Sequence, residues 1–216
     1  MNTFVIVLLL VSGANTQFSF PALTADQIVG NHLKFRMNLA SGGLYVQGVQ
    51  LPRATNMLKT FWDWTLAANA QTYADSCPTA PSGATGYGEN MHYIWTTTPA
   101  SILDSYAFNA PLKWAEQLSD YGLSSLTMDA TILASGVADA TQMMWAKTKY
   151  VGCGVKNCGP DPTQSNKTRI VAVCHYTPKG NIIGEDIYEQ GAIACSNCPA
   201  GTVCESYMGM STSMCV

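Results

Sequence analysis

Eight cysteines constrain this chain more than any other feature of its sequence, because their number is even and four of them fall within residues 195–216. An even cysteine count is typical of proteins that form disulfides in an oxidising compartment. Residues 195–216 have almost no apolar core of their own, so we expect bridges to hold this segment. The sequence alone leaves about 105 ways to pair eight cysteines.

The spacing Cys195-x-x-Cys198 also has two other readings, half of a zinc site or a redox pair. A zinc ribbon needs a second Cys-x-x-Cys at a suitable distance, and Cys204 and Cys215 are too widely spaced for that. The pattern therefore favours bridges over a metal site.

The N-terminal residues indicate secretion. Phe4–Val11 is an apolar run that is too short to cross a bilayer as a helix, and small residues follow it up to Thr16. This pattern predicts a signal peptide over residues 1–16, and the alternative is a buried apolar strand. No later stretch is long and apolar enough for a membrane span, so we expect a secreted protein without one.

Length and charge limit the remaining possibilities. A chain of 216 residues predicts one domain with at most a small appendage. The net charge is −3, with 11 basic and 14 acidic residues and no basic stripe, so the sequence argues against nucleic-acid binding. Asn166-Lys-Thr168 is a sequon in a polar loop, which makes Asn166 a candidate for N-glycosylation.

Hydrophobic periodicity predicts both helices and strands. Helices are expected over residues 24–40, with Thr24 as the N-cap, over 62–76 and over 107–120. Residues 149–155 and 169–176 read as neighbouring antiparallel strands, and 94–98 as a short strand. Residues 122–134 read as a loosely ordered connection.

Several of these segments resemble the signature motifs of one family. The residues from Gly136 to Gly154 are similar to the CAP superfamily (SCP/TAPS), which includes cysteine-rich secretory proteins, antigen 5 and class 1 pathogenesis-related proteins; the matches are Thr141, Gln142, Met143, Trp145, Gly152 and Cys153. Further matches are His32 and Arg36 in the first helix, Trp62-Asp63 in the second, Tyr87-Gly-Glu-Asn90, and Val173 to Asn181. The resemblance extends to nematode SCP-like and venom-allergen-like proteins.

The resemblance implies an α+β fold: a CAP-type α-β-α sandwich with a small antiparallel sheet between helical layers. It places the domain at residues 17–194 and a short disulfide-rich, hinge-like tail at 195–216. It also implies a disulfide pairing, Cys77–Cys158, Cys153–Cys174, Cys195–Cys204 and Cys198–Cys215.

Many members of this family carry two histidines and two glutamates in a central cleft, where the histidines can hold zinc. The corresponding positions here are Pro81, Glu89, Gln117 and Asp139, so both histidines and one glutamate are replaced. Zinc prefers imidazole, thiolate or carboxylate ligands, and neither proline nor an amide replaces an imidazole. We therefore expect no zinc and no other cofactor; two carboxylates would suit a hard cation if anything, and without one the pKa of one of them should rise.

The histidines of the chain do not change this expectation. His32 and His175 are interpreted as structural. Glu89-x-x-His92 has a metal-ligand spacing on a helix, but in a strand the two side chains point to opposite faces. No Gly-x-Ser-x-Gly elbow is present and all cysteines are expected to be paired, so the sequence predicts that the protein is not an enzyme.

Three functions follow, in decreasing order of support. The first is an extracellular protein that binds another protein or receptor in defence, host contact or signalling. The second is a carrier of a sterol or fatty acid, as for some relatives, with a contact loop formed by Tyr93, Trp95, Tyr106 and Phe108. The third is a hydrolase.

Overall fold

The computed structural model describes residues 20–216, so the expected signal peptide lies outside the described residues. Along the chain the elements are α1 (Ala22–Ala40), β1 (Tyr45–Val46), β2 (Val49–Gln50), β3 (Phe61–Trp62), α2 (Trp64–Asp75), β4 (Gly88–Thr96), α3 (Asp104–Tyr121), α4 (Ala130–Ala134), α5 (Ala138–Met144), β5 (Tyr150–Asp161), the 3-10 turn η1 (Pro162–Gln164), β6 (Lys167–Thr177), β7 (Cys204–Tyr207) and β8 (Met210–Cys215).

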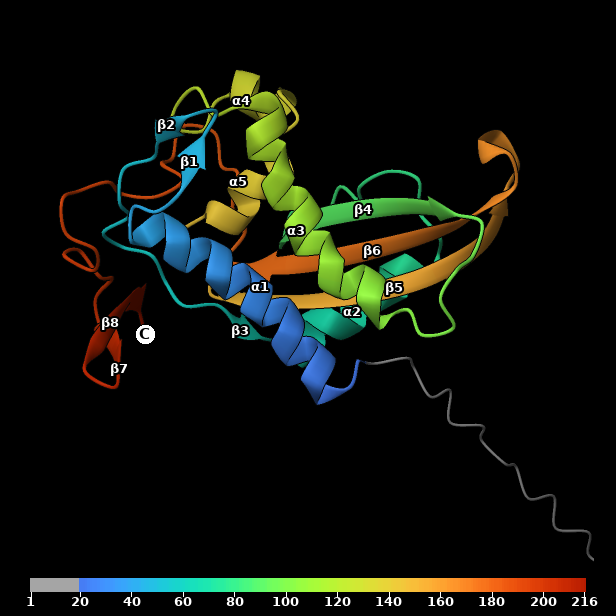
Figure 1. Cartoon of the computed structure of the whole chain (residues 1–216), viewed down its shortest axis with the longest axis horizontal. Coiled ribbons are helices and arrows are strands. Elements are labelled where there is room, and N and C mark those ends of the chain that lie inside the picture. Colours follow the sequence, from blue (N-terminus) through green and yellow to red (C-terminus); the bar gives the residue numbers. More distant parts are fainter. Residues whose placement is uncertain (1–19) are drawn as a thin grey trace, which may run out of the picture.

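A four-stranded sheet of order β3-β5-β6-β4 forms the middle layer. β6 runs antiparallel to both β5 and β4, as the two apolar runs predicted, whereas the short β3 pairs with β5 in parallel. Figure 1 shows α1 and α3 in front of the sheet and α2 behind it. The α+β sandwich implied by the resemblance is therefore the observed architecture.

Strand alternation explains how both faces of the sheet are buried. Ile170, Ala172 and Cys174 of β6 pack in the cluster that includes Trp114 of α3. The intervening Val171 and Val173 pack against the alanines of α2. Side chains of successive strand residues point to opposite faces, so one strand can supply both halves of the core.

Glycines in β5 allow α2 to approach the sheet closely. A Cβ on Gly152 would lie 2.2 Å from the backbone nitrogen of Ala67, and one on Gly154 would lie 2.4 Å from the Cα of Gln71. Any side chain at these two positions would push the helix away, so the glycine of the Gly-Cys motif has a packing role.

Element boundaries differ from those expected, and each difference has a local cause. α1 begins at Ala22 rather than Thr24, whose hydroxyl donates to Asp104 of α3 instead of capping the helix. α2 begins at Trp64 because the Asp63 side chain accepts from the Leu66 N–H, which leaves Trp62 in β3. α3 starts at Asp104, and residues 122–134 include the short α4, capped by Asp129.

Arg36 anchors α1 to the end of α5, to the segment after it and to Leu58. Its guanidinium donates to five backbone carbonyls, at 2.7–3.2 Å, on Leu58, Met143, Trp145, Ala146 and Thr148. The side chain is 1% exposed, and burial lowers the pKa of Arg36 to about 9. These carbonyls compensate for the burial of the charge, since an unpaired buried guanidinium would be strongly destabilising.

The disulfides are Cys77–Cys158, Cys153–Cys174, Cys195–Cys204 and Cys198–Cys215, the pairing that the resemblance implied. Residues 195–216 are nevertheless not an appendage held by bridges alone. Cys215 donates its N–H to the Met57 carbonyl (2.8 Å) and accepts from the Lys59 N–H (2.9 Å). Met214 is buried in the same core cluster as Met57. The tail has no separate core, and its last strand joins the core of the domain, so hydrogen bonds and packing hold it in addition to the bridges.

Within residues 20–216, every helix is too short or too polar to cross a membrane.

Candidate functional site

Three of the four positions of the expected cleft take part in two separate hydrogen-bonded groups, and Pro81 lies beside the first of them. Pro81 lies in the loop before β4, next to Ser82, whose N–H bonds to Glu89 at the start of β4. Asp139 lies in the first turn of α5 and bonds to Gln117 of α3. We describe the two groups separately because their electrostatics differ.

Glu89 is held by donors on both of its oxygens. Its Oε2 lies 2.9 Å from His175 Nε2, and its Oε1 accepts from the Ser82 N–H at 2.6 Å. The side chain of Glu89 is 8% exposed and that of His175 is 0% exposed. Burial alone would raise the pKa of Glu89, but the hydrogen bonds from His175 and Ser82 outweigh it and lower that pKa.

His175 comes from β6, directly opposite Glu89 in the sheet register. The Tyr87 ring stacks on the imidazole, with ring centroids 4.0 Å apart. The other ring nitrogen, Nδ1, is buried and has no hydrogen-bond partner among the described residues. The prediction that His175 is structural missed its contact with Glu89, because strand register is not visible in the sequence.

Asp139 has a different environment. Its Oδ2 accepts from Gln117 Nε2 at 2.8 Å, and Gln117 Oε1 accepts from the Ala140 N–H at 3.1 Å. Burial raises the pKa of Asp139 to about 6, against the opposing effect of hydrogen bonds from Gln117 and the Met91 N–H. The expected rise in one carboxylate pKa occurs, but burial causes it rather than repulsion from Glu89.

A chain of buried polar groups runs from this site to α1. Asn90 Nδ2 donates to the Asp139 carbonyl (2.9 Å) and contacts the Tyr176 hydroxyl (3.3 Å). His32 Nδ1 bonds to the Ile28 carbonyl, so it carries the proton, and Nε2 accepts from Tyr176. Burial lowers the pKa of His32 to about 4. His32 is therefore a neutral packing residue, consistent with its structural interpretation.

The residues present do not fit the zinc site that the resemblance implies. Glu89 has one imidazole beside it, and Asp139 has an amide. Within residues 20–216, the one group of three His, Cys, Asp or Glu side chains close enough to share an ion is Cys195, Cys198 and Cys215. Their sulfurs are all in disulfides and cannot act as thiolate ligands.

His92 does not complete a metal site with Glu89. Both residues lie on β4, where positions three apart face opposite sides of the sheet. Burial and the nearby Lys113 of α3 lower the pKa of His92, while Glu116 raises it. His92 thus belongs to the α3 side of the sheet, and Glu89 to the side of His175.

The order of groups around Glu89 also differs from that of a hydrolytic triad. In a triad the imidazole stands between the hydroxyl and the carboxylate. Here the carboxylate of Glu89 stands between Ser82 and the imidazole of His175. Among residues 20–216 the imidazole has no hydrogen bond to the Ser82 hydroxyl, through which it would have to take the proton.

The four aromatic residues expected to form a lipid-contact loop do not lie in a loop. Tyr93 and Trp95 are in β4, while Tyr106 and Phe108 are in α3. Tyr93 packs in the cluster under α2, and Tyr106 and Phe108 pack in the cluster on the opposite face of the sheet. The sheet separates the two pairs, so the expected single wall was wrong.

A different apolar groove lies between α1 and α3, with a volume of about 430 Å³. Its lining is mostly apolar, and three polar side chains of α1 border it; the residues are Asn31, Lys34, Phe35, Asn38, Pro111, Leu112 and Ala115. The sequence did not predict this groove, because the groove depends on how α1 and α3 pack together.

Asn166 follows η1 in the turn between β5 and β6 and is exposed. Its position in this turn leaves the side-chain amide accessible, as an acceptor of a glycan requires.

Comparisons with known proteins identify a family and several relatives of this chain. A family model described as "CAP: Cysteine-rich secretory protein family" matches residues 29–176. Peptidase inhibitor 16 of Bos taurus is 33% identical over 159 residues, which cover 72% of this chain and 32% of that protein. Venom allergen 5 of Lycosa singoriensis is 30% identical, with 82% and 46% covered. The chain thus spans less than half the length of these two relatives.

Solved structures show the same architecture. Na-ASP-1 superposes with a TM-score of 0.77 at 26% identity, over 100% of this chain and 52% of that chain. The crystal structure of NaASP2 with Zn2+ gives 0.74 at 26% identity, over 94% and 98% of the two chains.

Proposed function

Because the chain belongs to the cysteine-rich secretory protein (CAP) family, we propose that it is secreted and acts outside the cell by binding a protein or receptor, without a metal and without catalysis. The main support for this proposal is that, at the positions of the family's central site, the remaining carboxylates bond to other groups of this protein. Glu89 and Asp139 are each engaged by other side chains of this protein, in two groups rather than one.

Secretion is supported by several observations together. Four disulfides brace the fold, and such bridges persist in oxidising compartments. The residues before the domain have the pattern of a signal peptide. N-terminal sequencing of the secreted protein should begin near residue 17.

The tail offers a surface for a protein partner. Residues 193–210 carry four exposed apolar side chains; they are Ile193, Val203, Met208 and Met210, of which Met208 is 83% exposed. Methionine side chains adapt to partners of different shape, and exposed apolar patches mark interaction sites. Met208 lies in the turn between β7 and β8 and Met210 begins β8, a hairpin that Figure 1 shows apart from the main sheet.

The proposal is tested by binding to a panel of extracellular proteins and receptors. A specific partner should lose at least ten-fold in affinity on Met208→Asp combined with Met210→Asp, and should bind equally well in excess chelator. The matched control is Leu23→Asp in α1, an exposed apolar residue outside the tail. A partner whose binding requires zinc, or turnover of a peptide or ester that Glu89→Gln abolishes, would contradict the proposal.

The zinc content of the purified protein tests the proposal separately, because one similar structure was solved with Zn2+. We expect purified protein to contain less than stoichiometric zinc, for lack of imidazole ligands at positions 81 and 139. Stoichiometric zinc that disappears in Glu89→Ala would show that the site is functional after all.

The groove between α1 and α3 supports a second candidate, transport of a fatty acid. Its apolar lining suits an acyl chain, and Lys34 stands at its border as a counter-ion for a carboxylate. Ala115→Trp should fill the groove and reduce oleate binding at least ten-fold in calorimetry. Trp95→Ala, on the face first expected to bind lipid, is the control and should leave binding unchanged. Equal losses in both variants would argue against this groove.

A further inference from the structure

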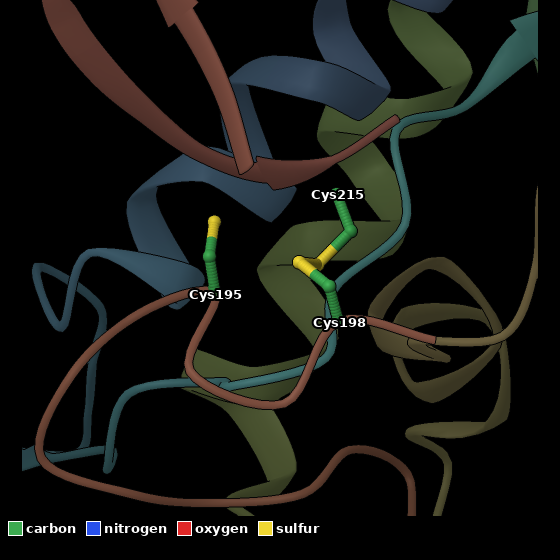
Figure 2. Close-up of side chains that lie close together, drawn as sticks. All are labelled: Cys195, Cys198 and Cys215. Atoms are coloured by element: carbon green, nitrogen blue, oxygen red, sulfur yellow. A yellow bond between two sulfur atoms is a disulfide. The ribbon is translucent and has the colours of Figure 1, made fainter. Parts of the chain in front are cut away.

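Two disulfides of the tail lie unusually close together. The sulfur atoms of Cys195, Cys198 and Cys215 are all within 4.8 Å of one another. Cys198 and Cys215 are bonded to each other, while Cys195 is bonded to Cys204. Figure 2 shows the Cys195 sulfur beside the Cys198–Cys215 bridge. One sulfur of the first bridge is thus near enough to attack the second after a small movement.

Access to the four sulfurs is unequal. Cys204 is exposed, Cys195 and Cys198 are half-buried, and Cys215 is 1% exposed. The Ser211 hydroxyl lies 3.2 Å from the Cys204 sulfur, and it must be the donor because a disulfide sulfur carries no hydrogen. In thiol–disulfide exchange the negative charge gathers on the attacking and leaving sulfurs rather than on the attacked one, so this hydrogen bond does not assist attack on Cys204, and the choice of Cys204 depends on its exposure. An external thiol can therefore reach Cys204 but not Cys215.

We propose that Cys204 is a site of covalent modification by small thiols, such as glutathione, and that Cys195 passes the exchange on to the Cys198–Cys215 bridge. This inference is independent of the proposed binding function, since it depends only on the arrangement of the sulfurs.

The exchange has two balanced steps. The external thiolate attacks the Cys204 sulfur; a mixed disulfide forms, the Cys195–Cys204 bond breaks, and Cys195 leaves as a thiolate. The Cys195 thiolate then attacks the Cys198 sulfur; a Cys195–Cys198 bond forms, the Cys198–Cys215 bond breaks, and Cys215 leaves as a thiolate that takes a proton from water. Two disulfides exist before and after, one external thiol is consumed and one cysteine thiol appears, so no oxidant or reductant is needed.

Attack on Cys198 is favoured over attack on Cys215. Cys195 and Cys198 are half-buried and lie at the two ends of one short turn, so a bridge between them closes a loop of only four residues. Cys215 is held in place by backbone bonds to Met57 and Lys59. In the product β8 stays docked by its backbone hydrogen bonds and β7 by the Lys59–Glu205 ion pair, but no disulfide links these strands to residues 195–198.

The first test treats the full oxidised chain with reduced glutathione at pH 8, followed by an acid quench, unfolding and alkylation. Peptide mapping without reduction should find glutathione on Cys204, a Cys195–Cys198 link and an alkylated Cys215. The buried Cys153–Cys174 bridge is the internal control and should stay intact. Glutathione on Cys195 with Cys198–Cys215 intact, or no adduct at all, would overturn the proposal.

A matched pair of variants tests the relay without glutathione. Cys204→Ser and Cys195→Ser each remove the same bridge and leave one free thiol, so any loss of stability is shared. In Cys204→Ser the free thiol should move from Cys195 to Cys215, with a Cys195–Cys198 link. In Cys195→Ser the free thiol should remain on Cys204. A thiol that stays on Cys195 in the first variant, or that spreads equally in both, would refute the relay.

Discussion

Glu89 and Asp139 stand at two positions of one family site, but different neighbours surround their charges. Glu89 receives hydrogen bonds from an imidazole and a backbone N–H, and its pKa falls. Asp139 receives bonds from an amide and a backbone N–H, and burial raises its pKa to about 6. The difference shows that a site which loses its histidines does not leave two equivalent acids. Glu89 is stabilised in its charged form, whereas the pKa of Asp139 lies close to neutral pH.

The largest expected effect comes from removing the stabilised carboxylate. Glu89→Ala leaves the buried His175 and the Ser82 N–H without their acceptor, so the free energy of unfolding at pH 7 should fall by about 2 kcal/mol. Because the folded pKa of Glu89 is lowered, its contribution should be present above its unfolded pKa and disappear as the pH falls through the folded value. Denaturant titrations at several pH values measure both.

The matched control for this variant is Glu116→Ala, which removes an exposed carboxylate paired with Lys113. A surface pair of this kind contributes about 0.5 kcal/mol or less. If both variants lost the same stability, Glu89 would not be specially stabilised and the comparison would fail.

Asp139→Asn should act in the opposite direction. The folded pKa of about 6 lies above the ordinary 3.8, so the folded state binds more protons between these values and the stability of the native protein falls as the pH rises from about 4 to 6. The shift corresponds to an upper limit of about 3 kcal/mol, but one amide oxygen cannot serve both donors as a carboxylate does. We therefore expect a gain of about 1 kcal/mol at pH 7 and none at pH 4, measured by the same titrations. A loss of stability at pH 7 would show that the charge is favourable.

Gln117→Glu places a second carboxylate beside Asp139, as at the family's position. Two acids in contact cannot both ionise readily, so the pair should hold one proton near neutral pH. Stability should fall by about 0.5–1 kcal/mol at pH 7 and recover below pH 5, because the Ala140 N–H keeps its acceptor. A pH-independent loss would indicate a packing defect instead.

The smallest expected effect is that of zinc itself. Excess zinc or chelator should shift the melting temperature by less than about 1 °C, because a ligand stabilises only in proportion to its binding to the folded state. Scanning fluorimetry with both additives measures this. A zinc-dependent rise that is lost in Asp139→Asn would mean that the two carboxylates do cooperate.

Much of the fold could be predicted because local patterns and family motifs specify it. The apolar runs at residues 149–155 and 169–176 identified β5 and β6, and the family resemblance implied all four bridges. The contact between Glu89 and His175 could not be predicted, since it depends on the register of β4 against β6. The prediction of one aromatic lipid-contact wall was wrong because Tyr93 and Tyr106 are near each other in sequence but lie on opposite faces of the sheet.

The role of Arg36 has a consequence for how such a protein can change over time. Its guanidinium binds backbone oxygens only, and every amino acid supplies one. Substitutions in the stretch from Met143 to Thr148 therefore leave these acceptors in place, and a nearby change such as that at position 139 does not remove one. Different residues determine the chemistry of the pocket and the stability of the structure around it. Residues of the pocket can therefore change during evolution while the surrounding structure is kept.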